Sequence, residues 1–233
     1  DLEIIFFGYT TSGDVFVINH DGSNLENFPV QLNEKVLKGG AIYDIDNNGK
    51  DDIVVATEND KSIFIIYDNG EFANIFTSND KFKSAPSILD NNGNITIVAG
   101  DEGGIFYGVS PIGNLEFNII TGDNVRSSAG FIDSDGTSGM FFGSEDGNIY
   151  GIDFNGNNLA NWPQTIIGGI SGNSTINSSP IFADIDNDGI SEIITASEEG
   201  QLIIYHINGS SYGNFPMQFD FGFISSPTII DID

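Results

Sequence analysis

A repeating unit of about 45 residues is the feature that most limits the folds open to this chain. Four stretches each bring Asp, Asn or Ser up to a glycine that is followed by an apolar run. These glycines are Gly49, Gly93, Gly136 and Gly189, so that successive units are 44, 43 and 53 residues apart. The longest unit contains a Gly/Ser/Asn-rich insertion at 166–177. Self-similarity at a fixed period of this length indicates a repeat architecture in which each unit forms one small supersecondary element.

Each unit contains short apolar runs separated by turns and shows no helical periodicity. A step of small residues and proline, such as Ser179-Pro180, precedes the first run and the glycine loop, and Ile193–Ser197 and Leu202–Ile207 follow. Three or four short strands per unit predict an all-β fold, a β-propeller of antiparallel blades, whereas a β-sandwich would not generate this repeat. We expect one domain over 1–233. Three units reach an Asn-aromatic-Pro step, which packing between blades explains most simply: Asn27-Phe28-Pro29, Asn161-Trp162-Pro163 and Asn214-Phe215-Pro216.

Two of the four loops, DIDNNGKDDI at 44–53 and DIDNDGISEI at 184–193, are rich in side-chain oxygen. Oxygen-bearing side chains take the first, third, fifth and ninth places, and glycine takes the sixth. Such oxygens suit Ca²⁺, which accepts six to eight of them in flexible geometry, and the backbone carbonyl of the seventh residue is a further candidate. The glycine permits the positive φ that wraps the chain around an ion. The predicted calcium ligands are Asp44, Asp46, Asn48, Lys50 and Asp52 in the first loop, and Asp184, Asp186, Asp188, Ile190 and Glu192 in the second.

These loops are not EF-hands. An EF-hand needs a glutamate in its twelfth place and helices on both sides, but the twelfth places are Val55 and Thr195 and the flanks are strand-like. The alternative is a polar turn that binds nothing, and the recurrence of one ligand order makes it the weaker interpretation. The loop at 89–97 is shorter, with Thr96 in the ninth place, and the loop at 131–140 has Phe131 and Gly139 in its first and ninth places. We assign calcium to neither.

The composition excludes several classes of function. Asp and Glu outnumber Lys and Arg by 34 to 7, which gives a formal net charge of −27, and residues 127–233 contain no Lys or Arg. Such a surface repels phosphate backbones and anionic lipid, so we expect neither nucleic-acid binding nor membrane insertion. No cysteine is present, which excludes disulfides and thiolate chemistry.

The loop pattern D-x-D-x-D-G-x-x-D resembles that of the FG-GAP/VCBS repeat family, β-propellers that include the integrin α-subunit head. It is matched at 184–192 with Glu192 in the last place, and at 44–52 with Asn48 in the fifth. The resemblance covers essentially the whole chain. It implies that each loop joins the first two strands of a blade and holds calcium on one face, while ligands dock on the opposite face. It also implies a propeller of seven blades, of which about five are visible here.

The two ends of the chain divide one more acidic loop between them. The last residues, with Asp231 and Asp233, repeat the first half of the loop at 184–193, and Glu3 stands in its ninth place. Either the ends complete one blade together, or the chain is a fragment of a longer propeller. We favour the fragment, because a closed domain needs no boundary through a metal loop.

The predicted function is a calcium-stabilised, non-enzymatic module for adhesion or for protein or carbohydrate binding, in a secreted or cell-surface protein. The insertion at 166–177 is the candidate contact surface, because binding residues concentrate on loops. The alternative is a polysaccharide lyase or glycoside hydrolase on a propeller frame, or an accessory module of one. Glycoside hydrolysis needs two carboxyl groups roughly 5–9.5 Å apart. The acidic pairs Asp101-Glu102, Glu145-Asp146 and Glu198-Glu199 recur at one turn of several units, however, as a structural role would require.

Overall fold

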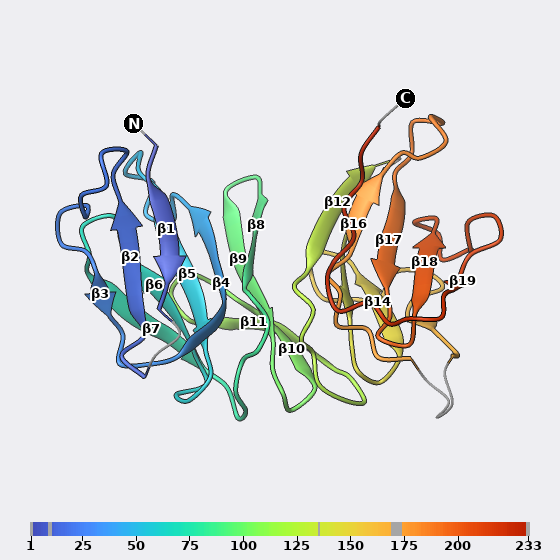
Figure 1. Ribbon diagram of the computed structural model, residues 1–233, viewed down its shortest axis with the longest axis horizontal. Helices are drawn as coiled ribbons and strands as arrows, with labels where there is room; N and C mark the ends of the chain where they lie inside the picture. Colours follow the sequence, from blue (N-terminus) through green and yellow to red (C-terminus); the bar gives the residue numbers. More distant parts are fainter. Residues whose placement is uncertain (1, 9–10, 135, 169–173, 232–233) are drawn as a thin grey trace. The chain divides into compact units, whose positions relative to one another are not determined.

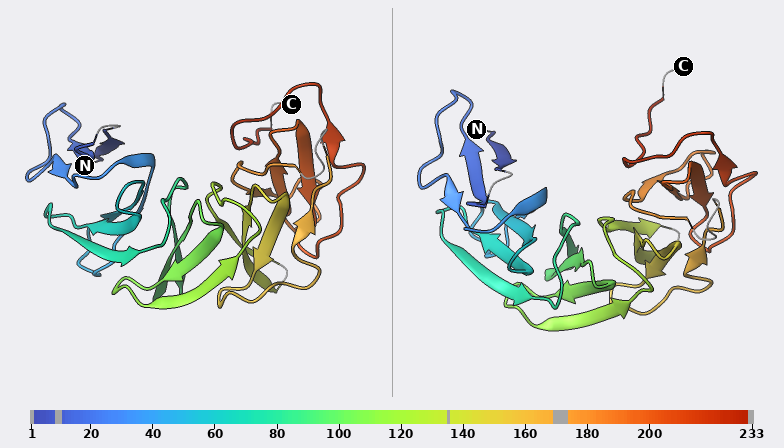
Figure 2. Two further views of the ribbon diagram at one scale, coloured as in Figure 1. Left: turned by 90° about the horizontal axis from the view of Figure 1, so that it is seen from below. Right: turned by 60° about the horizontal axis from the view of Figure 1, so that its bottom comes forward.

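The computed structural model describes residues 2–8, 11–134, 136–168 and 174–231. Their strands form five antiparallel sheets, and every sheet is made of strands that follow one another in the chain (Figure 1). The sheets remain separate groups of consecutive colours in the other two views (Figure 2). The sequence-based prediction of an all-β fold of repeated antiparallel blades is therefore confirmed. No helix in the described residues is long and apolar enough to cross a membrane.

The chain divides into two compact units. Unit 1 comprises Asp1–Gly103 and Tyr107–Glu116, and unit 2 comprises Gly104–Phe106 and Phe117–Asp233. The first sheet has three strands and the second has four. They are β1 (Ile4–Phe7), β2 (Asp14–Ile18) and β3 (Val30–Gln31), followed by β4 (Val36–Tyr43), β5 (Asp52–Thr57), β6 (Ser62–Ile66) and β7 (Phe72–Thr77).

Three further sheets of four strands complete the chain. The boundary between the units falls within the strands of the third sheet. These sheets are β8 (Ser87–Asn91), β9 (Asn94–Gly100), β10 (Ile105–Val109) and β11 (Leu115–Ile120); β12 (Gly130–Ser134), β13 (Thr137–Gly143), β14 (Asn148–Ile152) and β15 (Gln164–Thr165); and β16 (Ile181–Ala183), β17 (Glu192–Ala196), β18 (Gln201–Tyr205) and β19 (Met217–Gln218).

The second strands of two sheets, β5 and β17, lie in the interior. All residues of β5 and β17 are buried, which explains why these strands are continuous apolar runs rather than alternating ones. The acidic loops at 44–53 and 184–193 connect the first strand to the second in their sheets. The first predicted ligand of each loop directly follows the first strand, and the last, Asp52 or Glu192, is the first residue of the buried second strand. This connection is the one that the sequence pattern predicts.

The Asn-aromatic-Pro step at 161–163 joins two neighbouring sheets of unit 2. Trp162 is buried between Phe141 and Tyr205 in edge-to-face contacts, with ring centroids 4.9 and 5.8 Å from its own. Its Nε1 donates a hydrogen bond to the carbonyl oxygen of Ile207 at 2.9 Å. Trp162 therefore fixes the turn before β15 against the end of β18. Phe28 of unit 1 is also buried, whereas Phe215 is only partly buried, so the predicted packing role is confirmed at Trp162 and Phe28 alone.

Candidate metal centres in two acidic loops

The loop between β16 and β17 folds its backbone around its own carboxylates. Asp184 accepts hydrogen bonds from the amides of Asp188 and Gly189 at 3.0 and 2.9 Å, and Asp186 accepts a second one from Asp188 at 3.2 Å. Asp188 in turn accepts from the amide of Ile190 at 2.8 Å. Gly189 takes a φ of +92°, as predicted, which turns the chain back toward β17.

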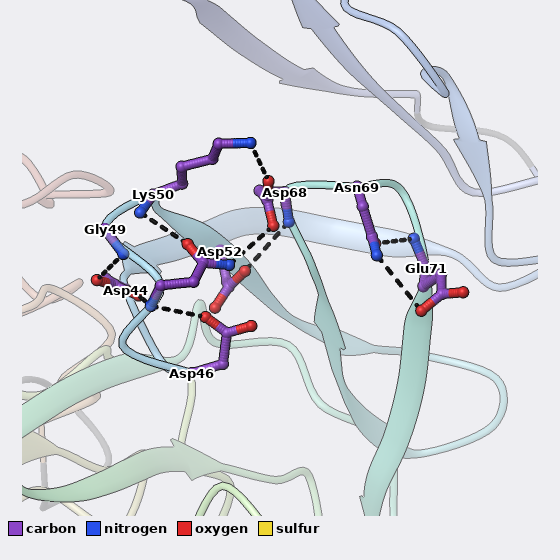
Figure 3. A network of polar contacts seen from close by, with 9 residues as sticks. Asp44, Asp46, Gly49, Lys50, Asp52, Asp68, Asn69 and Glu71 are labelled. Atoms are coloured by element: carbon purple, nitrogen blue, oxygen red, sulfur yellow. Dashed lines mark hydrogen bonds and ion pairs between the residues drawn. The ribbon is translucent and has the colours of Figure 1, made fainter.

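The loop between β4 and β5 has the same geometry (Figure 3). Asp44 accepts from the amides of Asn48 and Gly49 at 2.9 and 2.8 Å, and Asp46 accepts from Asn48 at 3.1 Å. The amide oxygen of Asn48 accepts from Lys50 at 2.9 Å, in the way that Asp188 accepts from Ile190. These two loops lie far apart in the sequence, and each contains the same set of hydrogen bonds between its backbone amides and its own side chains.

Each loop brings three carboxylates together. Asp44, Asp46 and Asp52 in the first loop, and Asp184, Asp186 and Asp188 in the second, each place an oxygen within 4.8 Å of the other two. Two unit charges at such a distance repel each other by on the order of 3 kcal/mol where the effective dielectric constant is about 20. A divalent cation among these oxygens would turn the repulsion into attraction.

The acid in the ninth place is fully buried in both loops. Asp52 accepts hydrogen bonds from the amides of Ile45 and Asp68 at 3.0 and 3.1 Å, and burial raises the pKa of its carboxyl above the ordinary value.

Glu192 accepts from the amide of Ile185 through Oε2 at 3.1 Å, while its Oε1 is buried without a hydrogen-bond partner. His206 Nδ1 lies 3.3 Å from this oxygen, at ion-pair distance but without hydrogen-bond geometry. A buried carboxylate oxygen without a hydrogen-bond partner lowers the stability of the folded chain. The residues present therefore fit a cation.

Lys50 and Ile190 occupy the seventh places, just before β5 and β17. Their amides bond to Asn48 and Asp188 as described, and calcium ligation by their carbonyl oxygens stays a prediction. The two side chains differ in charge and in their contacts. Lys50 Nζ lies 2.7 Å from the carboxylate of Asp68, which follows β6, whereas Ile190 is apolar.

The two loops without a calcium assignment are short hairpins. Asn92 and Gly93, with φ of +54° and +85°, form the two-residue turn between β8 and β9. The turn between β12 and β13 is equally short, and residue 135, one of its predicted acids, lies outside the described residues. Neither hairpin brings three carboxylates together in the described part of the chain.

Several of the recurring acidic turn residues make structural contacts. Glu102 pairs with Lys83 at 3.0 Å, Glu145 with Arg126 at 2.6 Å, and Glu198 accepts from Asn177 Nδ2 at 2.7 Å. These contacts tie a turn to the segment that precedes a first strand. Residues 169–173 of the insertion at 166–177 lie outside the described residues, so its role as a contact surface stays a prediction. Residues 1, 232 and 233 of the split terminal loop also lie outside them, so the interpretation of the two ends stays a prediction.

Comparison with known proteins identifies the class of fold. No protein-family model matches the chain, and no curated protein matches it. Among solved structures it is similar to BamB from Moraxella catarrhalis, with a TM-score of 0.62 and 19% identity over 88% of this chain and 59% of that one. It is also similar to BBS1N in complex with ARL6DN, soaked with lead, with a TM-score of 0.57 and 12% identity over 88% of this chain and 60% of that one.

The chain therefore has a β-propeller fold, and its sheets are propeller blades. It spans about three fifths of the length of the structures that it matches.

Proposed function

We propose that this chain is a calcium-stabilised propeller module of the FG-GAP/VCBS type, which binds a protein or carbohydrate ligand without catalysing a reaction. The observation that carries the proposal is the paired geometry of the two loops: three carboxylates converge in each, and the acid in the ninth place is fully buried. Repetition of this geometry at equivalent positions of two blades favours a structural ion, because a catalytic centre would be built once.

Bound calcium would neutralise the loop carboxylates. Asp44, Asp46, Asn48 and Asp52 would hold the ion in the first loop, and Asp184, Asp186, Asp188 and Glu192 in the second. The ion would thereby fasten the first strand of a blade to the second. Sites of this kind in extracellular modules bind calcium at about 10⁻⁴–10⁻³ M, so calcium outside the cell would fill them. This requirement supports a secreted or cell-surface setting.

Calorimetric titration with calcium tests the proposal. We expect two sites in the unaltered chain, one site in Asp46→Ala or Asp186→Ala, and none in the double variant. Asp133→Ala is the matched control, because Asp133 lies in a loop to which no calcium is assigned and bonds to Ser138. Calcium uptake that is unchanged in the double variant, or absent from the unaltered chain, would contradict the metal assignment.

A further inference from the structure

Unit 2 contains a pocket of about 610 Å³ beside its acidic loop. One wall is the turn before β15, including Leu159 and Asn161. The other walls are Asp188 and Ile190 of the acidic loop and the residues that follow β18, including Asn208. The volume lies within the range of about 300–1,000 Å³ that is usual for small-ligand sites. We call this cavity the interblade pocket.

The polar side chains of the interblade pocket are held in place by other bonds. Asn208 Oδ1 accepts from both the amide and the hydroxyl of Ser210, at 2.9 and 2.7 Å, and Asn161 Nδ2 donates to the carbonyl oxygen of Asn208 at 2.9 Å. Asn208 Nδ2 and Asn161 Oδ1 make no hydrogen bond to the described residues. One fixed donor and one fixed acceptor are therefore available to a ligand, at little entropic cost.

The remaining lining combines apolar surface with Thr137, His206 and one carboxylate. Leu159 and Ile190 are partly buried and pack against the hydrophobic cluster of unit 2. The carboxylate of Asp188 is exposed, and no Lys or Arg occurs after residue 126. Even with a divalent ion bound, the four acidic side chains of this loop leave a net negative charge, so an anionic ligand is disfavoured here. A neutral saccharide fits, because its hydroxyl groups both donate and accept hydrogen bonds while its C–H faces cover apolar side chains.

We propose that the interblade pocket binds a neutral oligosaccharide, an inference that rests on the proposed binding function and assigns its ligand class. Unit 1 supports the choice of pocket. A cavity of about 900 Å³ lies at the equivalent place, with Leu25, Asn27 and Asn69 at matching positions of the repeat. There, however, Lys50 and Asp68 form an ion pair where the interblade pocket has Ile190 and Ile207.

The only tryptophan of the chain reports on this pocket. Trp162 bonds to the carbonyl of Ile207, which lines the pocket, whereas unit 1 has Phe28 in its place. The experiment is a fluorescence titration of the calcium-loaded chain with neutral cello-, xylo- and malto-oligosaccharides, with oligogalacturonate and glucosamine oligomers as charged probes. We expect a saturable change in Trp162 emission with at least one neutral series and none with the charged probes.

Two variants make the test specific. Asn208→Asp keeps the Oδ1 acceptor for Ser210 but removes the Nδ2 donor, and it should weaken binding at least tenfold, whereas the matched Asn69→Asp should leave it unchanged. Ile190→Lys copies the first loop and should abolish binding while the chain still melts cooperatively. Three results would overturn the proposal. They are a saturable response to a charged probe alone, no saturable response to any saccharide, and binding by Asn208→Asp as tight as that of the unaltered chain.

The outcome can be separated from that of the proposed function. Calcium uptake at two sites together with no saccharide response would overturn the pocket assignment alone. Saccharide binding without calcium uptake would support the pocket and overturn the metal assignment alone.

Discussion

Lys50 places its ammonium 2.7 Å from the carboxylate of Asp68, and this pair ties the first acidic loop to the turn after β6 (Figure 3). Asn48 Nδ2 donates to the same carboxylate at 3.1 Å. The second loop has Ile190 and Ile207 at the matching places, and it has Asp188 instead of Asn48. The first loop therefore has three carboxylates among its predicted side-chain ligands and the second has four, although the two backbones follow the same path.

This difference predicts unequal calcium affinities. Ligand charge tunes the affinity of a calcium site, so the second loop should bind calcium more tightly. Asn48→Asp combined with Lys50→Ile gives the first loop the fifth- and seventh-place residues of the second. We expect its calcium dissociation constant to fall about tenfold, which corresponds to about 1.4 kcal/mol of binding free energy. Calorimetry would measure this fall, with Lys38→Ile as a control at an exposed lysine of β4. An unchanged or weaker first site would count against the assignment of these residues to the ion.

Trp162 predicts a stability cost at the contact between two blades. Trp162→Phe removes the hydrogen bond to Ile207 and leaves that carbonyl oxygen buried without its donor. An unsatisfied buried group costs about 1–3 kcal/mol, and we expect the free energy of unfolding to fall by this amount. Urea denaturation followed by circular dichroism would measure it. A change below about 0.5 kcal/mol, typical of a neutral surface substitution, would mean that this bond is unimportant.

Tyr150 and Asp146 predict a defined dependence of stability on pH. Burial raises the pKa of the Asp146 carboxyl, but hydrogen bonds from the Gly122 amide, the Tyr150 hydroxyl and the Asn148 amide outweigh it, and the pKa falls below its ordinary value. The folded chain thus binds fewer protons here than the unfolded chain. This contribution is present above the unfolded pKa of about 3.9 and is lost as the pH falls through the folded pKa.

Tyr150→Phe should weaken this protection. Removal of a hydrogen bond to a charged group costs about 1.5–3 kcal/mol, so stability at neutral pH should fall and acid unfolding should begin at a higher pH. Acid titration followed by circular dichroism would detect the shift. Tyr67→Phe is the control, because the Tyr67 hydroxyl makes no hydrogen bond to the described residues. An acid-unfolding midpoint that is equal in the two variants would refute the role of Tyr150.

The repeat predicted the fold because the turns and strands of each blade are determined by residues close together in the sequence. The run at Ile53–Thr57 starts one residue after the start of β5, and the run at Ile193–Ser197 is β17 shifted by one residue. Three of the predicted ligands of each loop also come together, since a nine-residue loop closes through its own Asp, Asn and Gly. The strands and the acidic loops could both be predicted because each depends on residues that are near one another in the sequence.

The missed features depend on packing between segments that are far apart in the chain. The contact of Lys50 with Asp68 spans 18 residues, and that of Trp162 with Ile207 spans 45. The sequence marked Glu192 as a ligand, but only the register of β17 within the sheet places this carboxylate in the interior with an unsatisfied oxygen. The interblade pocket likewise exists only after two blades have packed together.

The most direct test of the calcium assignment is a thermal melt of the chain in EDTA and in rising calcium, with magnesium as the control. At ten times the dissociation constant, each ion adds about 1.4 kcal/mol. For a chain of this size 1 kcal/mol corresponds to about 2–4 °C, so two filled sites should raise Tm by roughly 5–10 °C. We expect this rise with calcium, little with magnesium, and none in the Asp46→Ala/Asp186→Ala variant. An equal Tm in EDTA and calcium would contradict the assignment and leave the two loops as acidic turns.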